Sequence, residues 1–174
     1  LCYSDIKELF IESKKGNSHA YRIIKELYDL INISNKTNLN EMFKYFNNTI
    51  KKKSLVIILS DFLDKNFKNT LRSLSNTHDV ICIHIEDKKE RAIPDLGLIE
   101  IENNEENKKK WINTSSSEFN EIKKNTFIYN NNELQKFLKK INTNYLKVST
   151  ESDYVKDLIK LFKFRNTNWW EYLF

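Results

Sequence analysis

Two aliphatic runs constrain the fold of this chain more than any other feature. The first lies in SLVIILSDFLDK, where the run Leu55–Leu59 stops at a serine and Asp61. The second, DVICIHIED, is apolar almost throughout from Asp79 to Asp87. Between them the spacing predicts a helix over 63–75, whose inward face carries Phe67, Leu71 and Leu74. Strands that are apolar on both faces and alternate with amphipathic helices indicate a parallel sheet covered on two sides.

The rest of the chain extends the same α/β pattern. Apolar residues at helical spacing predict further helices over 23–31, 38–50, 118–124, 133–141 and 153–164. Short apolar runs predict a hairpin over 1–13, a small β excursion at 98–103 and 110–114, and a last strand over 144–150. The sequence shows no internal repeat and no interdomain linker. We therefore expect one α/β domain over 1–165, followed by an aromatic tail at 166–174.

Charge and cysteine usage limit the classes of function. The formal net charge is +5, but the lysines are scattered among acidic residues, and the densest runs, Lys51–Lys53 and Lys108–Lys110, are short. Neither run is interleaved with aromatic residues that could stack on bases, so we expect no specific nucleic-acid site. The distant cysteines Cys2 and Cys82 are typical of small buried side chains in a reducing, cytoplasmic compartment. No apolar run reaches the roughly 18–20 residues that a membrane span requires.

Asp61 is the first candidate for a functional residue. In an open parallel sheet, ligands bind beyond the carboxyl ends of the strands, and Asp61 lies at such an end. Its carboxylate could bind a metal ion, or it could cap the following helix, which stabilises a helix by roughly 0.5–2 kcal/mol. Its position alone favours the cap.

Thr37 raises the same two alternatives. It directly precedes the helix expected over 38–50, where a threonine normally caps. Its hydroxyl could instead join a carboxylate in binding a hard cation such as Mg²⁺. Two oxygen donors do not complete the near-octahedral shell that Mg²⁺ demands, so these two residues alone do not define a site.

Other motifs give little support to an enzyme. The histidines have no spacing suited to zinc; His84 is expected as a hydrogen-bonded core residue and His78 in a helix–strand turn. The sequence has no G-x-S-x-G elbow, and its two distant glycines cannot form a phosphate-binding loop. No nucleophile–base pair is evident. We therefore expect a protein that is not an enzyme.

The order of these segments resembles the C-terminal part of the DUF58 family of bacterial proteins. In DVICIHIEDKKERAIPDLGLIEIEN the chain is similar to the family's strand, its D-x-x-E-x-x-x-P-x-x-G segment and a short following strand. The segments WINTSSSEF and NYLKVSTESDYVKDLIKLFKFR resemble the family's later strand and helix regions. LCYSDIKELFIESKKGNSHAYRIIKEL resembles its second and third strands and the next helix. The resemblance runs from Leu1 to about Arg165.

The resemblance implies a von Willebrand A-like fold, a three-layer α/β sandwich with a mostly parallel sheet. It also implies a metal-ion-dependent adhesion site, built from a D-x-S-x-S motif after the first strand, a threonine and a later aspartate. Thr37 matches the threonine and Asp61 the aspartate. For both residues the resemblance therefore favours a metal site, with Mg²⁺ the expected ion in the intact family fold, over a cap.

One departure from the family pattern changes this expectation. The D-x-S-x-S motif occurs nowhere in these 174 residues, because the sequence begins downstream of the strand that should carry it. In von Willebrand A folds that first strand lies centrally in the sheet. We therefore expect a truncated product, or part of a gene split upstream, that lacks the first central strand. Its metal site would be incomplete, with no ion bound by this chain alone.

The resulting functional hypothesis is a cytoplasmic, non-enzymatic protein-interaction module. The resemblance suggests a MoxR-type AAA+ ATPase as its partner, because such ATPases are often encoded beside the family. The alternative is a divalent-metal-dependent hydrolase, such as a nuclease, with Asp61 and Asp87 near strand ends. A third hypothesis is an inactive gene fragment.

Overall fold

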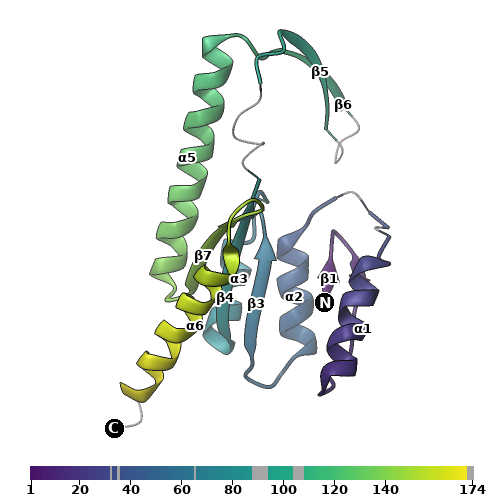
Figure 1. The fold of residues 1–174 in the computed structure, drawn as a ribbon, viewed down its shortest axis with the longest axis vertical. Helices are drawn as coiled ribbons and strands as arrows, with labels where there is room; N and C mark the ends of the chain where they lie inside the picture. The colour runs from purple at the N-terminus through teal and green to yellow at the C-terminus, as the bar shows by residue number, and fades with distance from the viewer. Residues whose placement is uncertain (32, 35, 65, 88–93, 104–107, 172–174) are drawn as a thin grey trace. The chain divides into compact units, whose positions relative to one another are not determined.

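The computed structural model describes residues 1–174 apart from 32, 35, 65, 88–93, 104–107 and 172–174 (Figure 1). The chain divides into two compact units, the first made of Leu1–Lys51, Asp64–Leu71 and Glu102–Lys109 and the second of the remaining residues. In chain order the elements are β1 (Cys2–Tyr3), β2 (Lys7–Leu9), α1 (Asn17–Tyr28), α2 (Leu39–Thr49), β3 (Leu55–Ser60), α3 (Lys68–Thr77), β4 (Asp79–Glu86), β5 (Leu98–Asn103), β6 (Lys108–Asn113), α5 (Ser117–Lys140), β7 (Asn144–Ser149) and α6 (Tyr154–Glu171).

The first unit contains the predicted hairpin and two helices. Strands β1 and β2 pair antiparallel as a separate two-stranded sheet. The core of this unit lies under α2, where the ring of Phe43 meets that of Phe67 edge-on with 6.2 Å between their centroids. Helix α1 ends at Tyr28, so its predicted extension to residue 31 was wrong. The reason is local, because β-branched and Asn residues dominate 31–35 and are poor helix formers.

The second unit contains a three-stranded sheet with the order β3-β4-β7. Both pairings are parallel, with Ile57 opposite Ile81 and Ile83 opposite Leu146. The expected parallel sheet is thus confirmed, and β3 has the bounds that its aliphatic run predicted. A further two-stranded sheet, whose residues fall partly in each unit, pairs β5 with β6, and it confirms the predicted β excursion.

The two faces of the parallel sheet differ in how far they are covered. We call them the Val56 face and the Ile57 face, since successive residues of a strand point to opposite sides. On the Val56 face both strands are buried, together with apolar residues of α3 and α5, which are Leu74, Leu134, Phe137 and Leu138. On the Ile57 face, Ile81 and Ile83 of β4 are buried, whereas β3 exposes Leu55, Ile57 and Leu59.

Two-sided burial was therefore predicted correctly for β4 and wrongly for β3. Strand β3 lies at the edge of the sheet, and its Ile57 face is exposed. Helix α6 lies instead at the β4–β7 side, where Arg165 bonds to Asp79 and Asn144 at the starts of those strands (Figure 1).

Three further helices differ from their predicted bounds. Helix α3 begins at Lys68 instead of residue 63. Helix α5 is continuous over Ser117–Lys140, where two shorter helices were expected, because its Asn-rich middle contains neither Gly nor Pro to break it. Helix α6 continues past residue 165, the expected end of the domain, to Glu171 within the expected aromatic tail at 166–174. None of the helices, within the described residues, has the length and apolarity needed to cross a membrane.

Candidate functional site

The candidate site lies at the carboxyl ends of β3 and β4, where Asp61 follows the last residue of β3. The Asp61 side chain is exposed, and its Oδ1 accepts hydrogen bonds from the Leu63 N–H at 3.3 Å and the Ser60 hydroxyl at 3.4 Å. The Ser60 hydroxyl in turn accepts from the Phe62 N–H at 3.0 Å. These bonds form a tight polar turn of the kind that Asp and Ser favour. The turn holds the carboxylate at the edge of the sheet.

Phe62 fixes this turn through its side chain. Its φ is 54°, in the left-handed region that bulky residues rarely adopt, and its ring is buried. The ring meets that of His84 edge-on, with 5.9 Å between the centroids. Contact with the neighbouring strand thus anchors a strained backbone, and the chain leaves β3 in a turn and not in a helix. Asp61 does not cap α3, which begins only at Lys68, so the capping hypothesis was wrong for this residue.

The capping hypothesis was also wrong for Thr37. Helix α2 is capped by Asn38, whose Oδ1 accepts from the Glu41 N–H at 3.0 Å. The carboxylate of Asp64 accepts from the Leu39 N–H at 2.7 Å, which satisfies another donor at this helix start. Thr37 is exposed and belongs to the first unit, whereas Asp61 belongs to the second.

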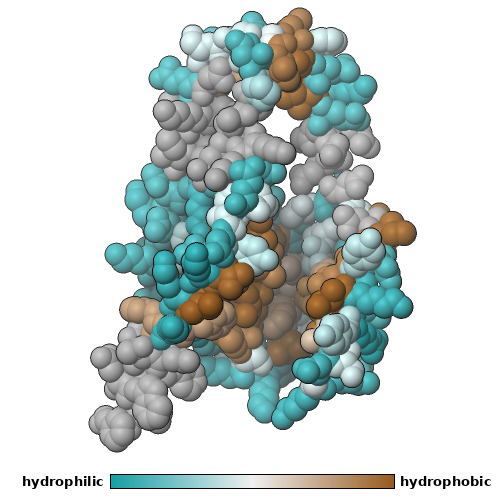
Figure 2. Space-filling model, in the orientation of Figure 1, coloured by the Kyte–Doolittle hydropathy of each residue, from teal (hydrophilic) through white to brown (hydrophobic). Residues whose placement is uncertain are grey.

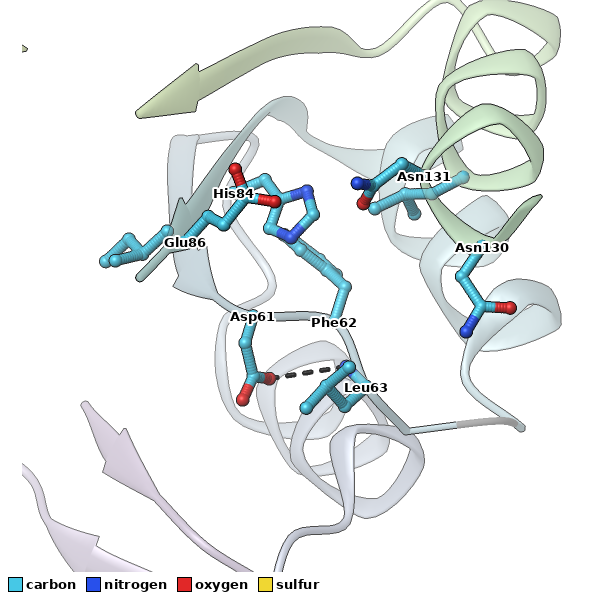
Figure 3. A pocket seen from close by; sticks show the side chains of 9 residues that line it. Asp61, Phe62, Leu63, His84, Glu86, Asn130 and Asn131 are labelled. Atoms are coloured by element: carbon cyan, nitrogen blue, oxygen red, sulfur yellow. Dashed lines mark hydrogen bonds between the residues drawn. The ribbon is translucent and has the colours of Figure 1, made fainter. Parts of the chain in front are cut away.

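A small pocket opens next to the Asp61 turn. Strand ends on one side and α5 on the other supply its lining, which includes Asp61, Phe62, His84, Glu86, Asn130 and Asn131. Figure 3 shows the Asp61 carboxylate turned toward Leu63 and away from the carboxylate of Glu86. The two carboxylates therefore do not converge on one point.

The buried polar groups beneath the pocket have partners inside the protein. Glu86 forms an ion pair with Lys147 of β7, with 3.0 Å between Oε1 and Nζ. His84 Nδ1 lies 2.9 Å from the Tyr145 hydroxyl, which confirms the expectation of a hydrogen-bonded core histidine. The Glu86–Lys147 pair was missed from sequence, although each residue is a charge near the end of an apolar strand. Asp61 is therefore the exposed carboxylate of the pocket, whereas Glu86 and His84 are buried and bonded within the protein.

Burial also keeps two nearby ionisable groups, Cys82 and Tyr145, protonated at neutral pH. Burial raises the pKa of the Cys82 thiol to about 12, so the thiol stays protonated and is a poor nucleophile near neutral pH. Burial, followed by the nearby Cys82, raises the pKa of Tyr145 to about 12. Tyr145 therefore remains a neutral phenol and does not act as a base at neutral pH.

The donors around Asp61 do not fit a complete Mg²⁺ site. Mg²⁺ requires near-octahedral oxygen coordination, whereas the carboxylate of Glu86, which also lines the pocket, is engaged with Lys147. Among the described residues, no three or more His, Cys, Asp or Glu side chains lie together so that they could hold a metal ion. Asp61 therefore offers a metal ion one exposed carboxylate, which is not a complete site.

Comparison with known protein families gives a match. A family described as "Protein of unknown function DUF58" matches residues 1–127, which include Thr37, Asp61 and the D-x-x-E-x-x-x-P-x-x-G segment at 87–97. Residues 88–93 of that segment lie outside the described residues. No curated protein matches, and no solved structure matches.

Proposed function

The chain belongs to the DUF58 family, and on that premise we propose that it is a non-enzymatic protein-interaction module with a von Willebrand A-like sheet. The observation that carries the proposal is the exposed Asp61 carboxylate at the carboxyl end of β3. In open parallel sheets this end forms the crevice where ligands bind. The partner we propose is a MoxR-type AAA+ ATPase, met in the cytoplasm.

The chemistry of the site supports binding over catalysis. Cys82 and Tyr145 keep their protons at neutral pH, and Glu86 is neutralised by Lys147 beneath the pocket. Asp61 is held by hydrogen bonds to its own turn, so its carboxylate is already oriented before a partner arrives. A preorganised acceptor loses little conformational entropy on binding.

We propose that the Asp61 carboxylate makes the contact itself, by accepting charge-assisted hydrogen bonds from an Arg or Lys of the partner. In the intact family fold, Thr37 and Asp61 would be ligands of Mg²⁺, and an acidic residue of the partner would complete the shell. The present chain lacks the D-x-S-x-S motif that the shell also requires. Its own contribution to recognition is therefore the carboxylate and the pocket wall.

Co-purification tests the proposal. The chain would be co-expressed with a MoxR-type ATPase from the same genome, as wild type, Asp61→Ala and Asp153→Ala. Asp153 is an exposed carboxylate paired with Lys156 at 3.0 Å, and it serves as the matched control. We expect Asp61→Ala to lower recovery of the ATPase by about tenfold or more, as for a central interface residue, and Asp153→Ala to leave it unchanged. Equal recovery with all three forms would count against the proposal.

Calorimetric titration with Mg²⁺ tests the incomplete metal site separately. We expect wild type and Asp61→Ala to bind Mg²⁺ equally weakly, because one carboxylate cannot supply the required shell. A clear affinity that depends on Asp61 would show that this chain holds a complete site, and the direct-contact proposal would then be wrong.

A further inference from the structure

The pocket beside the Asp61 turn has polar groups on two walls. One wall is formed by the turn and the strand ends, and the other is α5, which contributes Asn130 and Asn131. His84 and Glu86 line the pocket from the Val56 face of the sheet. Every lining residue belongs to the second unit, so the pocket does not depend on where the first unit lies.

Hydrogen-bond acceptors are available on both walls. The two hydrogen bonds of the Asp61 carboxylate go to Oδ1, and among the described residues its Oδ2 has no partner. The side-chain amides of Asn130 and Asn131 likewise make no hydrogen bond within the described part of the chain. Each amide presents a carbonyl oxygen that accepts hydrogen bonds. A ligand with several N–H donors therefore finds acceptors on the turn and on α5.

The pocket carries an uncompensated negative charge on Asp61. The other lining carboxylate, Glu86, lies 3.0 Å from the ammonium group of Lys147, which offsets its charge. Asp61 has no such counter-charge among the described residues. This balance attracts a single positive charge and repels anions such as phosphate.

The size and lining of the pocket suit the end of one long side chain. Its space is about 430 Å³ including the open mouth, near the lower end of the roughly 300–1,000 Å³ of ligand pockets. Phe62 and Leu63 also line it, and they can pack against the methylene stem of a cationic side chain. Figure 2 shows apolar side chains gathered over the sheet of the second unit, but mainly hydrophilic ones along the described part of α5. The α5 wall therefore favours a polar group over an apolar anchor.

We propose that the pocket takes the guanidinium group of an arginine of the partner, and that Asn130 and Asn131 select arginine over lysine. The inference rests on the proposed function, which left the cation as either Arg or Lys. Figure 3 shows the Asp61 carboxylate on the turn and the two asparagine side chains across from it on α5. A lysine ammonium is a compact point charge, so it satisfies Asp61 and leaves the amides unused. A guanidinium spreads five N–H donors over a planar fork and so bonds to both walls.

Titration of the isotope-labelled full chain with N-acetyl-L-arginine amide and N-acetyl-L-lysine amide, followed by NMR, gives the first test. Both probes carry one positive charge and neutral ends, like a side chain within a partner. We expect the arginine probe to shift the side-chain amide signals of Asn130 and Asn131, with a dissociation constant on the order of 1–10 mM. The lysine probe should bind at least about fivefold more weakly, because it cannot use both walls. Equal affinities, or no shift of these amides up to about 100 mM of the arginine probe, would overturn the proposal.

Free L-arginine distinguishes a partner's side chain from a small-molecule ligand. It carries the same guanidinium as the capped probe, together with an α-ammonium and an α-carboxylate. The cation nearest to hand, Lys147, is engaged with Glu86 and does not favour the extra carboxylate. We therefore expect free L-arginine to bind no more tightly than the capped probe. Binding about tenfold tighter would make the pocket a site for the free amino acid, and the proposal would be wrong.

Substitution on α5 gives the second test, with a matched control one residue away. Asn131→Leu removes an acceptor from the wall, and we expect it to weaken the arginine probe about three- to tenfold while the lysine probe is unchanged. Asn132 is an exposed asparagine of the same helix that does not line the pocket, so Asn132→Leu should keep the wild-type selectivity. Leucine is a good helix former, so circular dichroism should show intact folding in both variants. An Asn131→Leu variant with wild-type selectivity would refute the role of the α5 wall.

The probes and the co-purification separate this inference from the proposed function. If Asp61→Ala lowers recovery of the ATPase but the arginine and lysine probes bind alike, the proposed function stands and the selection of arginine is wrong. If the arginine probe binds selectively but recovery of the ATPase does not depend on Asp61, the selection of arginine stands and the proposed ATPase partner is wrong.

Discussion

Strands β3 and β4 are neighbours with similar aliphatic sequences but very different surroundings. Ile57 and Ile81 are the same residue type, directly opposite in register and on the same face of the sheet. Nevertheless the residue exposure is 43% for Ile57 and 0% for Ile81. The difference arises because β4 lies between two strands, whereas β3 lies at the edge. An aliphatic run therefore identifies a strand, but its neighbours decide whether both faces are buried.

The largest effect that this comparison predicts is on stability. Ile81→Ala leaves a cavity in a fully buried position, and we expect it to lower the free energy of unfolding by about 2–5 kcal/mol. Ile57→Ala removes a half-exposed side chain and should cost less than about 1 kcal/mol. Urea unfolding measures the loss of stability for both variants. Equal losses would show that β3 is buried on its Ile57 face after all.

A second prediction concerns the ion pair at the carboxyl end of β4. The side chains of Glu86 and Lys147 are 3% and 32% exposed, so Lys147→Met leaves a buried carboxylate without its counter-charge. We expect a loss of about 1–3 kcal/mol, below the value for a fully buried pair because Lys147 retains contact with solvent.

The matched control for that variant is Lys136→Met on α5. Lys136 pairs with Glu133 at 3.5 Å, but both side chains are exposed, so the loss should stay within about 0.5 kcal/mol. Urea unfolding again measures the two variants. If both cost the same, Glu86 must gain another counter-charge or water when Lys147 is removed.

Local patterns in the sequence predicted part of the fold because they report local physics. The bounds of β3, the parallel sheet and the position of Asp61 at a strand end all follow from the aliphatic runs and their spacing. Thr37 and Asn38 are both good capping residues, so their chemistry does not show which one begins α2. The hypothesis that Thr37 and Asp61 belong to a metal site came from the family resemblance and not from composition or spacing. The family match over residues 1–127 supports that resemblance.

The features that could not be predicted depend on contacts distant in the sequence. Phe62 takes its left-handed conformation while packed against His84, so the turn that replaced the expected helix start is fixed by another strand. The Glu86–Lys147 pair likewise requires the register of β4 with β7. The exposure of β3 on its Ile57 face depends on which part of the sheet α6 covers. The helical spacing of apolar residues in α6 predicts the helix but not its position on the sheet.

The smallest effect concerns the Val56 face, which is buried on both strands. Cys82 lies there, opposite Ile58, and burial raises the pKa of its thiol from 9.0 to about 12. Between these pH values the unfolded chain has lost the thiol proton and the folded chain has kept it. The free energy of unfolding therefore falls as pH rises through this window, by about 1 kcal/mol between pH 8 and pH 10 from this thiol. Below pH 8 the contribution is constant.

Between pH 8 and pH 10, the free energy of unfolding should therefore fall by about 1 kcal/mol less in Cys82→Ala than in wild type. Urea unfolding at each pH measures this difference. Cys2→Ala, on the hairpin strand β1, should keep the wild-type dependence because it retains Cys82. Tyr145 is present in all three proteins, and burial is the larger cause of its raised pKa, so most of its own alkaline contribution cancels in the comparison. A Cys82→Ala variant that falls as steeply as wild type would mean that solvent reaches the thiol. The Val56 face would then be open over β4, and the contrast between the two faces would disappear.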